Sequence, residues 1–143
     1  MLTVDANVFI SASTPTEVFH ADSDNFLLRA GRGGVLFFCP TLVLPEIASG
    51  IIRPTGDVVA TQEAVRRVQT LPGLTLVDLT DQRALRAARA VSDYRLRGAD
   101  AVYIAVAQEH GTTLITWDKE VLTRGAQAVP TMTPTDWLAA NPI

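Results

Sequence analysis

Short runs of apolar or alternating residues recur along the chain and predict β-strands. Most of these runs are bounded by glycine, proline or an acidic residue, which commonly mark the ends of strands. One run is wholly apolar, as in a strand covered on both faces of its sheet; it spans Val35–Cys39. The predicted strands are Leu2–Val4, Val35–Cys39, Leu74–Asp78, Thr113–Trp117 and Ala128–Met132.

The segments between these runs place apolar residues at helical spacing. One predicted helix starts at Thr41, and we expect it to end before Gly50 and Pro54 because both residue types favour helix ends. The other predicted helices are Phe19–Ala30, Thr61–Thr70, Asp81–Leu96, Asp100–His110, Glu120–Arg124 and Pro134–Leu138. Strands that alternate with helices imply βαβ units with right-handed crossovers. The pattern therefore predicts an α/β fold with a mainly parallel central sheet flanked by helices.

Two faces of the predicted helix over residues 81–96 differ in chemistry. The residues expected to face inward are Leu85, Ala88, Val91 and Ser92, and those expected to face outward are Arg83, Arg86 and Arg89. A solvated face is the favoured interpretation of the arginine stripe, with contact to RNA as the alternative.

The composition is that of a globular protein that can fold without a structural metal ion or a disulfide. The chain has 143 residues, of which 48% are hydrophobic, and a formal net charge of −3. We expect a single domain over residues 1–143. One cysteine, Cys39, excludes an intramolecular disulfide and a cysteine-rich zinc site. Because no apolar stretch is long enough to span a membrane and the first residues do not resemble a signal peptide, we expect a cytoplasmic protein without a membrane partner.

Four acidic residues are predicted to meet at one edge of the sheet. In an open parallel sheet, the carboxyl ends of the strands and the first turns of the following helices share an edge. Asp5 ends the first strand, and Glu46 lies in the first turns of the helix that begins near Thr41. Asp100 opens a helix at this edge. The chain then descends about 15 Å through helix and climbs about 16 Å through strand, which returns Asp118 to the same level.

A cluster of carboxylates needs a cation. Like charges within a few ångströms raise one another's pKa, so four acids cannot all remain ionised and unpaired. Oxygen ligands without paired histidine or cysteine favour Mg²⁺ or Mn²⁺ over zinc. One or two such ions activate water and neutralise the charge of a phosphodiester during in-line displacement. The sequence therefore predicts a divalent-metal site suited to phosphodiester cleavage.

Each acid also has a purely structural interpretation. Asp5 and Asp100 both stand where an acid caps a turn or a helix and interacts favourably with the helix dipole. Glu46 is otherwise an exposed acid near a helix start, and Asp118 is otherwise a turn residue. For each acid alone the structural interpretation is favoured. The placement of all four at one edge favours the metal site.

Four short motifs, in order along the chain, resemble those of the PIN-domain ribonucleases, especially the VapC-type toxins of bacterial toxin–antitoxin pairs. The motifs are Val4-Asp5-Ala6-Asn7-Val8-Phe9, Pro45-Glu46-Ile47-Ala48-Ser49-Gly50, Leu96-Arg97-Gly98-Ala99-Asp100-Ala101 and Leu114-Ile115-Thr116-Trp117-Asp118-Lys119. The ending Met132–Leu138 is also similar, and order, spacing and total length agree over the whole chain. A single motif of this kind is weak, whereas four in order are specific.

The resemblance implies a PIN-like three-layer sandwich that cleaves RNA with Mg²⁺ or Mn²⁺. By motif position, the metal-coordinating and catalytic acids are Asp5, Glu46, Asp100 and Asp118. We expect the three aspartates to hold the metal and the glutamate to complete its coordination or to orient water. The resemblance also implies a cognate antitoxin as partner and frequent homodimerisation.

Three further residues belong to the predicted site, and two aromatic residues near the motifs do not. Asn7 and Thr116 match polar positions that support the site in PIN-domain relatives, and Arg97 precedes Asp100 closely enough to meet RNA phosphate. The aromatic residues are Tyr103 and Trp117, which we interpret as core or dimer contacts.

Several alternatives stay open at this point. A housekeeping RNA-processing nuclease of the same fold and a catalytically silent binding module fit the same motifs. Phosphoryl transfer of the haloacid-dehalogenase kind is disfavoured, because Asn7 stands where that chemistry needs a general acid and the only lysine, Lys119, directly follows Asp118. A response-regulator receiver is disfavoured because the chain lacks adjacent acids near its first strand and a lysine on its last.

Overall fold

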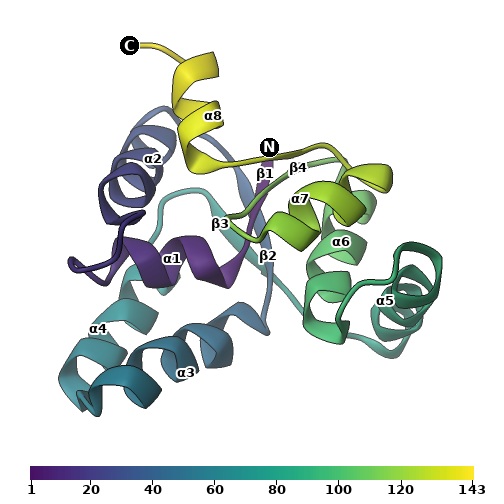
Figure 1. The fold of residues 1–143 in the computed structure, drawn as a ribbon, viewed down its shortest axis with the longest axis horizontal. Helices are drawn as coiled ribbons and strands as arrows, with labels where there is room; N and C mark the ends of the chain where they lie inside the picture. The colour runs from purple at the N-terminus through teal and green to yellow at the C-terminus, as the bar shows by residue number, and fades with distance from the viewer.

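The computed structural model describes residues 1–143, and its strands form one parallel sheet (Figure 1). The strands are β1 (Leu2–Val4), β2 (Phe37–Pro40), β3 (Leu74–Val77), β4 (Thr113–Ile115) and β5 (Thr131–Met132). They lie in the order β3-β2-β1-β4-β5, and every neighbouring pair is parallel. Parallel neighbours need crossover connections, which the helices provide. The predicted α/β fold with a parallel central sheet is confirmed.

Eight α-helices flank the sheet on both faces. They are α1 (Ala6–Ala12), α2 (His20–Arg32), α3 (Val43–Thr55), α4 (Val58–Gln69), α5 (Asp81–Tyr94), α6 (Gly98–His110), α7 (Lys119–Arg124) and α8 (Pro134–Ala140). Figure 1 shows α1 to α4 on one side of the strands and α5 and α6 on the other, which gives three layers. None of these helices combines the length and the apolar character that a membrane span requires.

Helix α6 is enclosed by the rest of the protein. Seven consecutive residues, Ala101–Ala107, are buried, so the helix has no extended solvent-facing side in its middle. It packs against β1, β2 and β4 and against α5. The first turn of α6, which carries Asp100, is thereby fixed at the carboxyl edge of the sheet.

Helix α3 continues through Gly50 and Pro54, so the expectation that both residues lie beyond its end is wrong. Gly50 faces α1, where a Cβ atom would lie only 2.3 Å from Ile10 Cδ1. Close packing of two helices, rather than helix termination, therefore explains this glycine. Pro54 stands in the last turn, and the helix ends directly afterwards at Gly56, whose φ of 65° is a left-handed cap.

The inward face of α5 also differs from the prediction. The buried residues are Ala87 and Ala90, whereas Leu85, Ala88 and Ser92 are exposed and Val91 is half-buried. Leu85 leaves 69% of its surface exposed. Small alanine side chains allow α5 to lie close against α6. This close contact, rather than the burial of the larger Leu85 side chain, sets which face of α5 points inward.

Candidate active site

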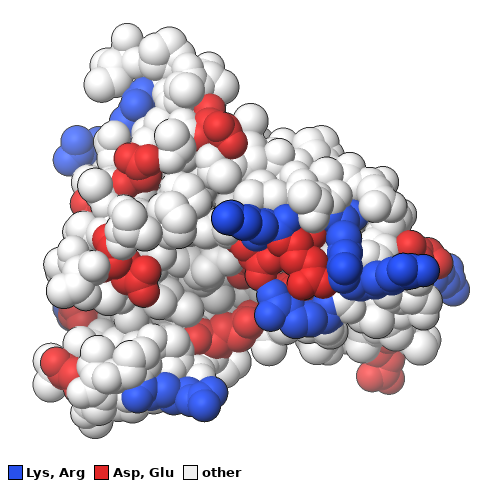
Figure 2. Space-filling view, viewed as in Figure 1, with Lys and Arg blue, Asp and Glu red and all other residues white.

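The four predicted acids line one cleft at the carboxyl edge of the sheet. Asp5 directly follows β1, and Asp118 is the N-cap of α7. Glu46 and Asp100 lie in the first turns of α3 and α6. The cleft has a volume of about 410 Å³, and Figure 2 shows its acidic surface in a hollow with basic side chains along the border. Four separate elements thus place their carboxylates along one cleft.

Asn7 and Thr116 hold the side chain of Asp5 through hydrogen bonds. Asp5 Oδ2 accepts a hydrogen bond from Asn7 Nδ2 at 3.1 Å and one from Thr116 Oγ1 at 2.8 Å. Asn7 is itself oriented, because its Oδ1 accepts a hydrogen bond from the backbone N–H of Trp117. No side chain donates a hydrogen bond to the second oxygen of Asp5, Oδ1, so that atom faces no side-chain competitor for a cation.

Burial makes these carboxyls difficult to ionise. Asp5 is 6% exposed. Desolvation raises the pKa of Asp5 from 3.8 to about 7; the Thr116 hydrogen bond opposes this rise, and the charges of Asp100 and Glu46 add to it. Desolvation likewise raises the pKa of Glu46 and the pKa of Asp100. A bound cation would favour the ionised form of all three groups.

Tyr103 fixes Glu46, a contact that the sequence analysis missed. The phenol Oη of Tyr103 donates a hydrogen bond of 2.7 Å to Glu46 Oε1. Its side chain is 1% exposed, so the interpretation of Tyr103 as a core residue is correct for its ring but omits its hydroxyl. The available signal is spacing: Tyr103 lies three residues after Asp100 in one helix and therefore on the same face.

Arg97 joins Asp100 to Asp118. Asp118 Oδ1 accepts hydrogen bonds from the backbone N–H groups of Glu120 (2.8 Å) and Val121 (3.2 Å), which cap α7. Asp118 Oδ2 accepts a hydrogen bond from Arg97 Nη2 at 2.5 Å, and Arg97 Nε donates to Asp100 Oδ2 at 3.1 Å. Asp118 therefore has a structural role as a cap in addition to its place in the cleft.

The chemistry of the donor set fits Mg²⁺ or Mn²⁺. All the candidate ligands are carboxylate oxygens, which hard divalent cations prefer. Asp5, Glu46 and Asp100 each keep one oxygen to which no side chain donates a hydrogen bond. As the side chains stand, however, no three Asp, Glu, His or Cys residues are close enough together to hold one ion. Coordination by all the acids thus requires their side chains to move closer.

The arginine stripe of α5 is largely engaged within the protein. Arg83 forms two hydrogen bonds to Glu109, at 2.7 and 3.0 Å, and Arg86 lies 3.6 Å from the same carboxylate. These ion pairs favour the interpretation of the stripe as a solvated face.

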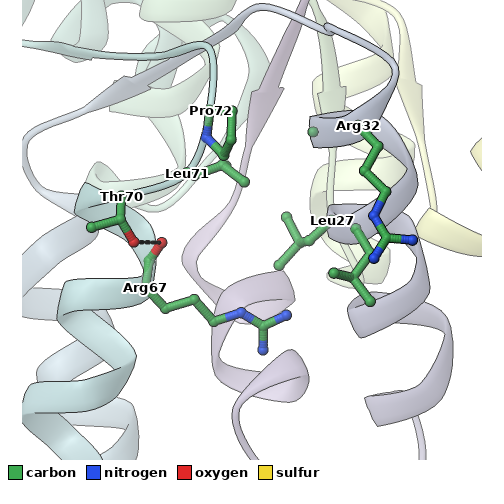
Figure 3. A pocket seen from close by; sticks show the side chains of 8 residues that line it. Leu27, Arg32, Arg67, Thr70, Leu71 and Pro72 are labelled. Atoms are coloured by element: carbon green, nitrogen blue, oxygen red, sulfur yellow. Dashed lines mark hydrogen bonds between the residues drawn. The ribbon is translucent and has the colours of Figure 1, made fainter.

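A second pocket, of about 250 Å³, lies between α2 and the end of α4 and shares no residue with the acidic cleft (Figure 3). Its lining contains leucines, Arg32 and Arg67, and no acidic residue. Arg67 is held by the carbonyl oxygen of Ala12 and by an ion pair with Asp24. The residues that line this pocket therefore add no group to the acidic cleft.

Comparison with known proteins identifies the family. A family model described as the PIN domain matches residues 2–126, whereas no curated protein matches the sequence. The fold is similar to that of VapC20 from Mycobacterium tuberculosis, a sarcin-ricin loop cleaving toxin (TM-score 0.71, 17% identity, 90% of this chain and 96% of that chain). It is also similar to FitAcB from Neisseria gonorrhoeae (TM-score 0.70, 17% identity, 94% and 99%) and to VapBC2 from Rickettsia felis bound to promoter DNA (TM-score 0.70, 12% identity, 92% and 97%). Since the family model covers most of its length, the chain belongs to the PIN domain family.

Proposed function

We propose that the chain is a Mg²⁺- or Mn²⁺-dependent endoribonuclease that acts as the toxin of a type II toxin–antitoxin pair. The observation that carries the proposal is the convergence of four carboxylates on one cleft. Membership of the PIN domain family supports nuclease chemistry. The toxin role is supported by structural neighbours, which include a sarcin-ricin loop cleaving toxin and a toxin–antitoxin complex from Klebsiella pneumoniae.

In the proposed reaction, each acid has a distinct task. Asp5, Asp100 and Asp118 would hold the cation, and Glu46 would complete its coordination or orient the attacking water. A bound divalent cation activates water and neutralises charge on the phosphodiester. No histidine lines the cleft, so the carboxylates are the groups available to take the proton of the water.

Neighbouring residues keep these acids in position and meet the substrate. The hydrogen bonds of Asn7 and Thr116 fix Asp5, and that of Tyr103 fixes Glu46. Arg97 leaves 64% of its side chain exposed at the rim of the cleft, and a guanidinium matches the geometry of a phosphate group. We therefore assign RNA phosphate contact to Arg97.

Cleavage of a structured RNA tests the nuclease proposal. The purified chain should cut the RNA with Mn²⁺, stop in EDTA, and fail as Asp5→Ala. Asp93→Ala is a matched control, because Asp93 is exposed on α5, away from the cleft, and it should retain activity. Cleavage that persists in Asp5→Ala would mark a contaminating nuclease. Wild-type protein without activity would favour a silent binding module.

The toxin role needs a separate test, because a housekeeping nuclease of the same fold would pass the first. We expect a short reading frame immediately upstream to encode a protein that copurifies with this chain and blocks its cleavage of RNA. An active nuclease without such a partner would be a housekeeping RNA-processing enzyme.

A further inference from the structure

The backbone before Arg97 is firmly held. Arg95 adopts a left-handed conformation with φ of 55°, which is uncommon for a residue other than glycine. Its carbonyl oxygen accepts a hydrogen bond of 2.9 Å from Arg124 Nη1, and Leu96 is 4% exposed. Arg97 follows as the N-cap of α6. Its Cα position is therefore fixed at the rim, while its long side chain is largely in solvent.

The guanidinium of Arg97 occupies the only oxygen that Asp118 can offer a metal ion and one of the two oxygens of Asp100. Asp118 has only Oδ2 to offer the cleft, because Oδ1 is committed to the cap of α7. That Oδ2 atom accepts the hydrogen bond from Arg97 Nη2, and Asp100 Oδ2 accepts the one from Nε. The same guanidinium bridges the two carboxylates where a shared ion would bind, and no three acidic side chains are close enough together to hold one as they stand.

We propose that Arg97 competes with the metal ion for Asp100 and Asp118, so that its guanidinium must swing out of the cleft before a cation can use both carboxylates. This inference rests on the proposed metal-dependent function. Displacement is feasible because the arginine side chain is 64% exposed and no buried contact has to break. Exposed ion pairs contribute little free energy, whereas a divalent cation offers each carboxylate a stronger partner.

Two consequences follow from this competition. The apparent metal affinity is reduced by the fraction of molecules in which Arg97 bridges the acids. Once displaced, the guanidinium lies at the rim of the cleft, where it is free to meet a phosphate. Because coupling between two ligands is reciprocal, metal and RNA phosphate should each strengthen the binding of the other.

Calorimetric titration of metal-free protein with Mn²⁺ tests the competition without relying on activity. Arg97→Met keeps the apolar stem and removes the fork, and we expect its dissociation constant for Mn²⁺ to be about fivefold lower than that of the wild type. Arg97→Lys keeps the charge but loses the two-pronged contact, so it should bind with intermediate affinity. Circular dichroism of each variant should match the wild type, since Arg97 is mostly exposed.

The matched control is Lys119→Met. Lys119 is exposed, directly follows Asp118 and forms no ion pair, so its loss removes one positive charge near the cleft without removing a bridge. We expect the Mn²⁺ affinity of this variant to change less than twofold. Equal tightening in both Met variants would show that charge alone matters and would overturn the inference. An unchanged or weaker affinity in Arg97→Met would also overturn it, while the metal site would stand. Wild-type and variant proteins that both fail to bind Mn²⁺ would overturn the metal site and the inference together.

Discussion

Replacement of Asp5 by asparagine tests whether the burial of the Asp5 carboxyl group destabilises the folded protein when that group is ionised. Asp5 is almost fully buried, and desolvation raises its pKa to about 7 in the folded protein. Asparagine has nearly the same shape and keeps an oxygen that can accept the Thr116 hydrogen bond, but it does not titrate. The difference between the two proteins should therefore depend on pH.

The sign and size of the effect come from the two pKa values of Asp5. Because the pKa is raised from 3.8 on folding to about 7, the folded state binds the proton more tightly than the unfolded state. The stability from Asp5 is complete below the unfolded pKa and is lost as pH rises through about 7. Between pH 5 and pH 8, the wild type should lose about 2–3 kcal/mol relative to Asp5→Asn in its free energy of unfolding.

Urea unfolding in the presence of EDTA measures this loss directly. The free energies of wild type and Asp5→Asn should diverge as pH is raised, with the variant gaining. Any change that does not depend on pH, such as an altered hydrogen bond, cancels when the difference at pH 5 is subtracted from that at pH 8. Asp93→Asn, on an exposed part of α5, should show no divergence. Parallel profiles for wild type and Asp5→Asn would refute the argument that Asp5 is buried at an energetic cost.

Three further substitutions test single contacts. Tyr103→Phe removes the donor to Glu46 and should weaken Mn²⁺ binding about tenfold in calorimetry; an unchanged affinity would show that Glu46 needs no such support. Gly50→Ala would place a Cβ atom 2.3 Å from Ile10 Cδ1. In urea unfolding it should lower the free energy of unfolding by about 1–3 kcal/mol. Adding Ile10→Ala to the same chain should partly restore that free energy. Arg95→Gly relaxes the left-handed backbone at φ of 55° and should cost little or raise stability by up to about 1 kcal/mol, whereas a large loss would mean that the Arg95 side chain stabilises the turn.

The positions of the acids were predictable because they depend on chain direction and element length. A strand must end where its hydrogen-bonded ladder ends, so Asp5 after β1 falls at the carboxyl edge. From Asp100 the chain runs down α6 and returns through β4 and the two residues after it, which brings Asp118 close enough to Asp100 for Arg97 to bridge the two. Errors of one or two residues at element ends do not change the edge on which these side chains lie.

Contacts between elements were not predictable in the same way. The periodicity of α5 favours Leu85 inward, yet the close contact with α6 selects the face of Ala87 and Ala90. The glycine at position 50 signals a helix end locally but serves the approach of α1 to α3. Helix α1 has seven residues and no clear helical period, and the sequence analysis predicts no helix there. Each of these features depends on a partner that is distant in sequence.

Thermal unfolding with and without Mn²⁺ tests the central claim, that the four acids form a metal site, most directly. At neutral pH and a Mn²⁺ concentration about 100 times its dissociation constant, binding to the folded state alone adds about 2.7 kcal/mol. For a chain of 143 residues, the unfolding midpoint of the wild type should then rise by about 5–10 °C. The same addition should leave the midpoint of Asp100→Asn nearly unchanged. A wild-type midpoint that does not respond to millimolar Mn²⁺, or an equal rise in Asp100→Asn, would contradict the account.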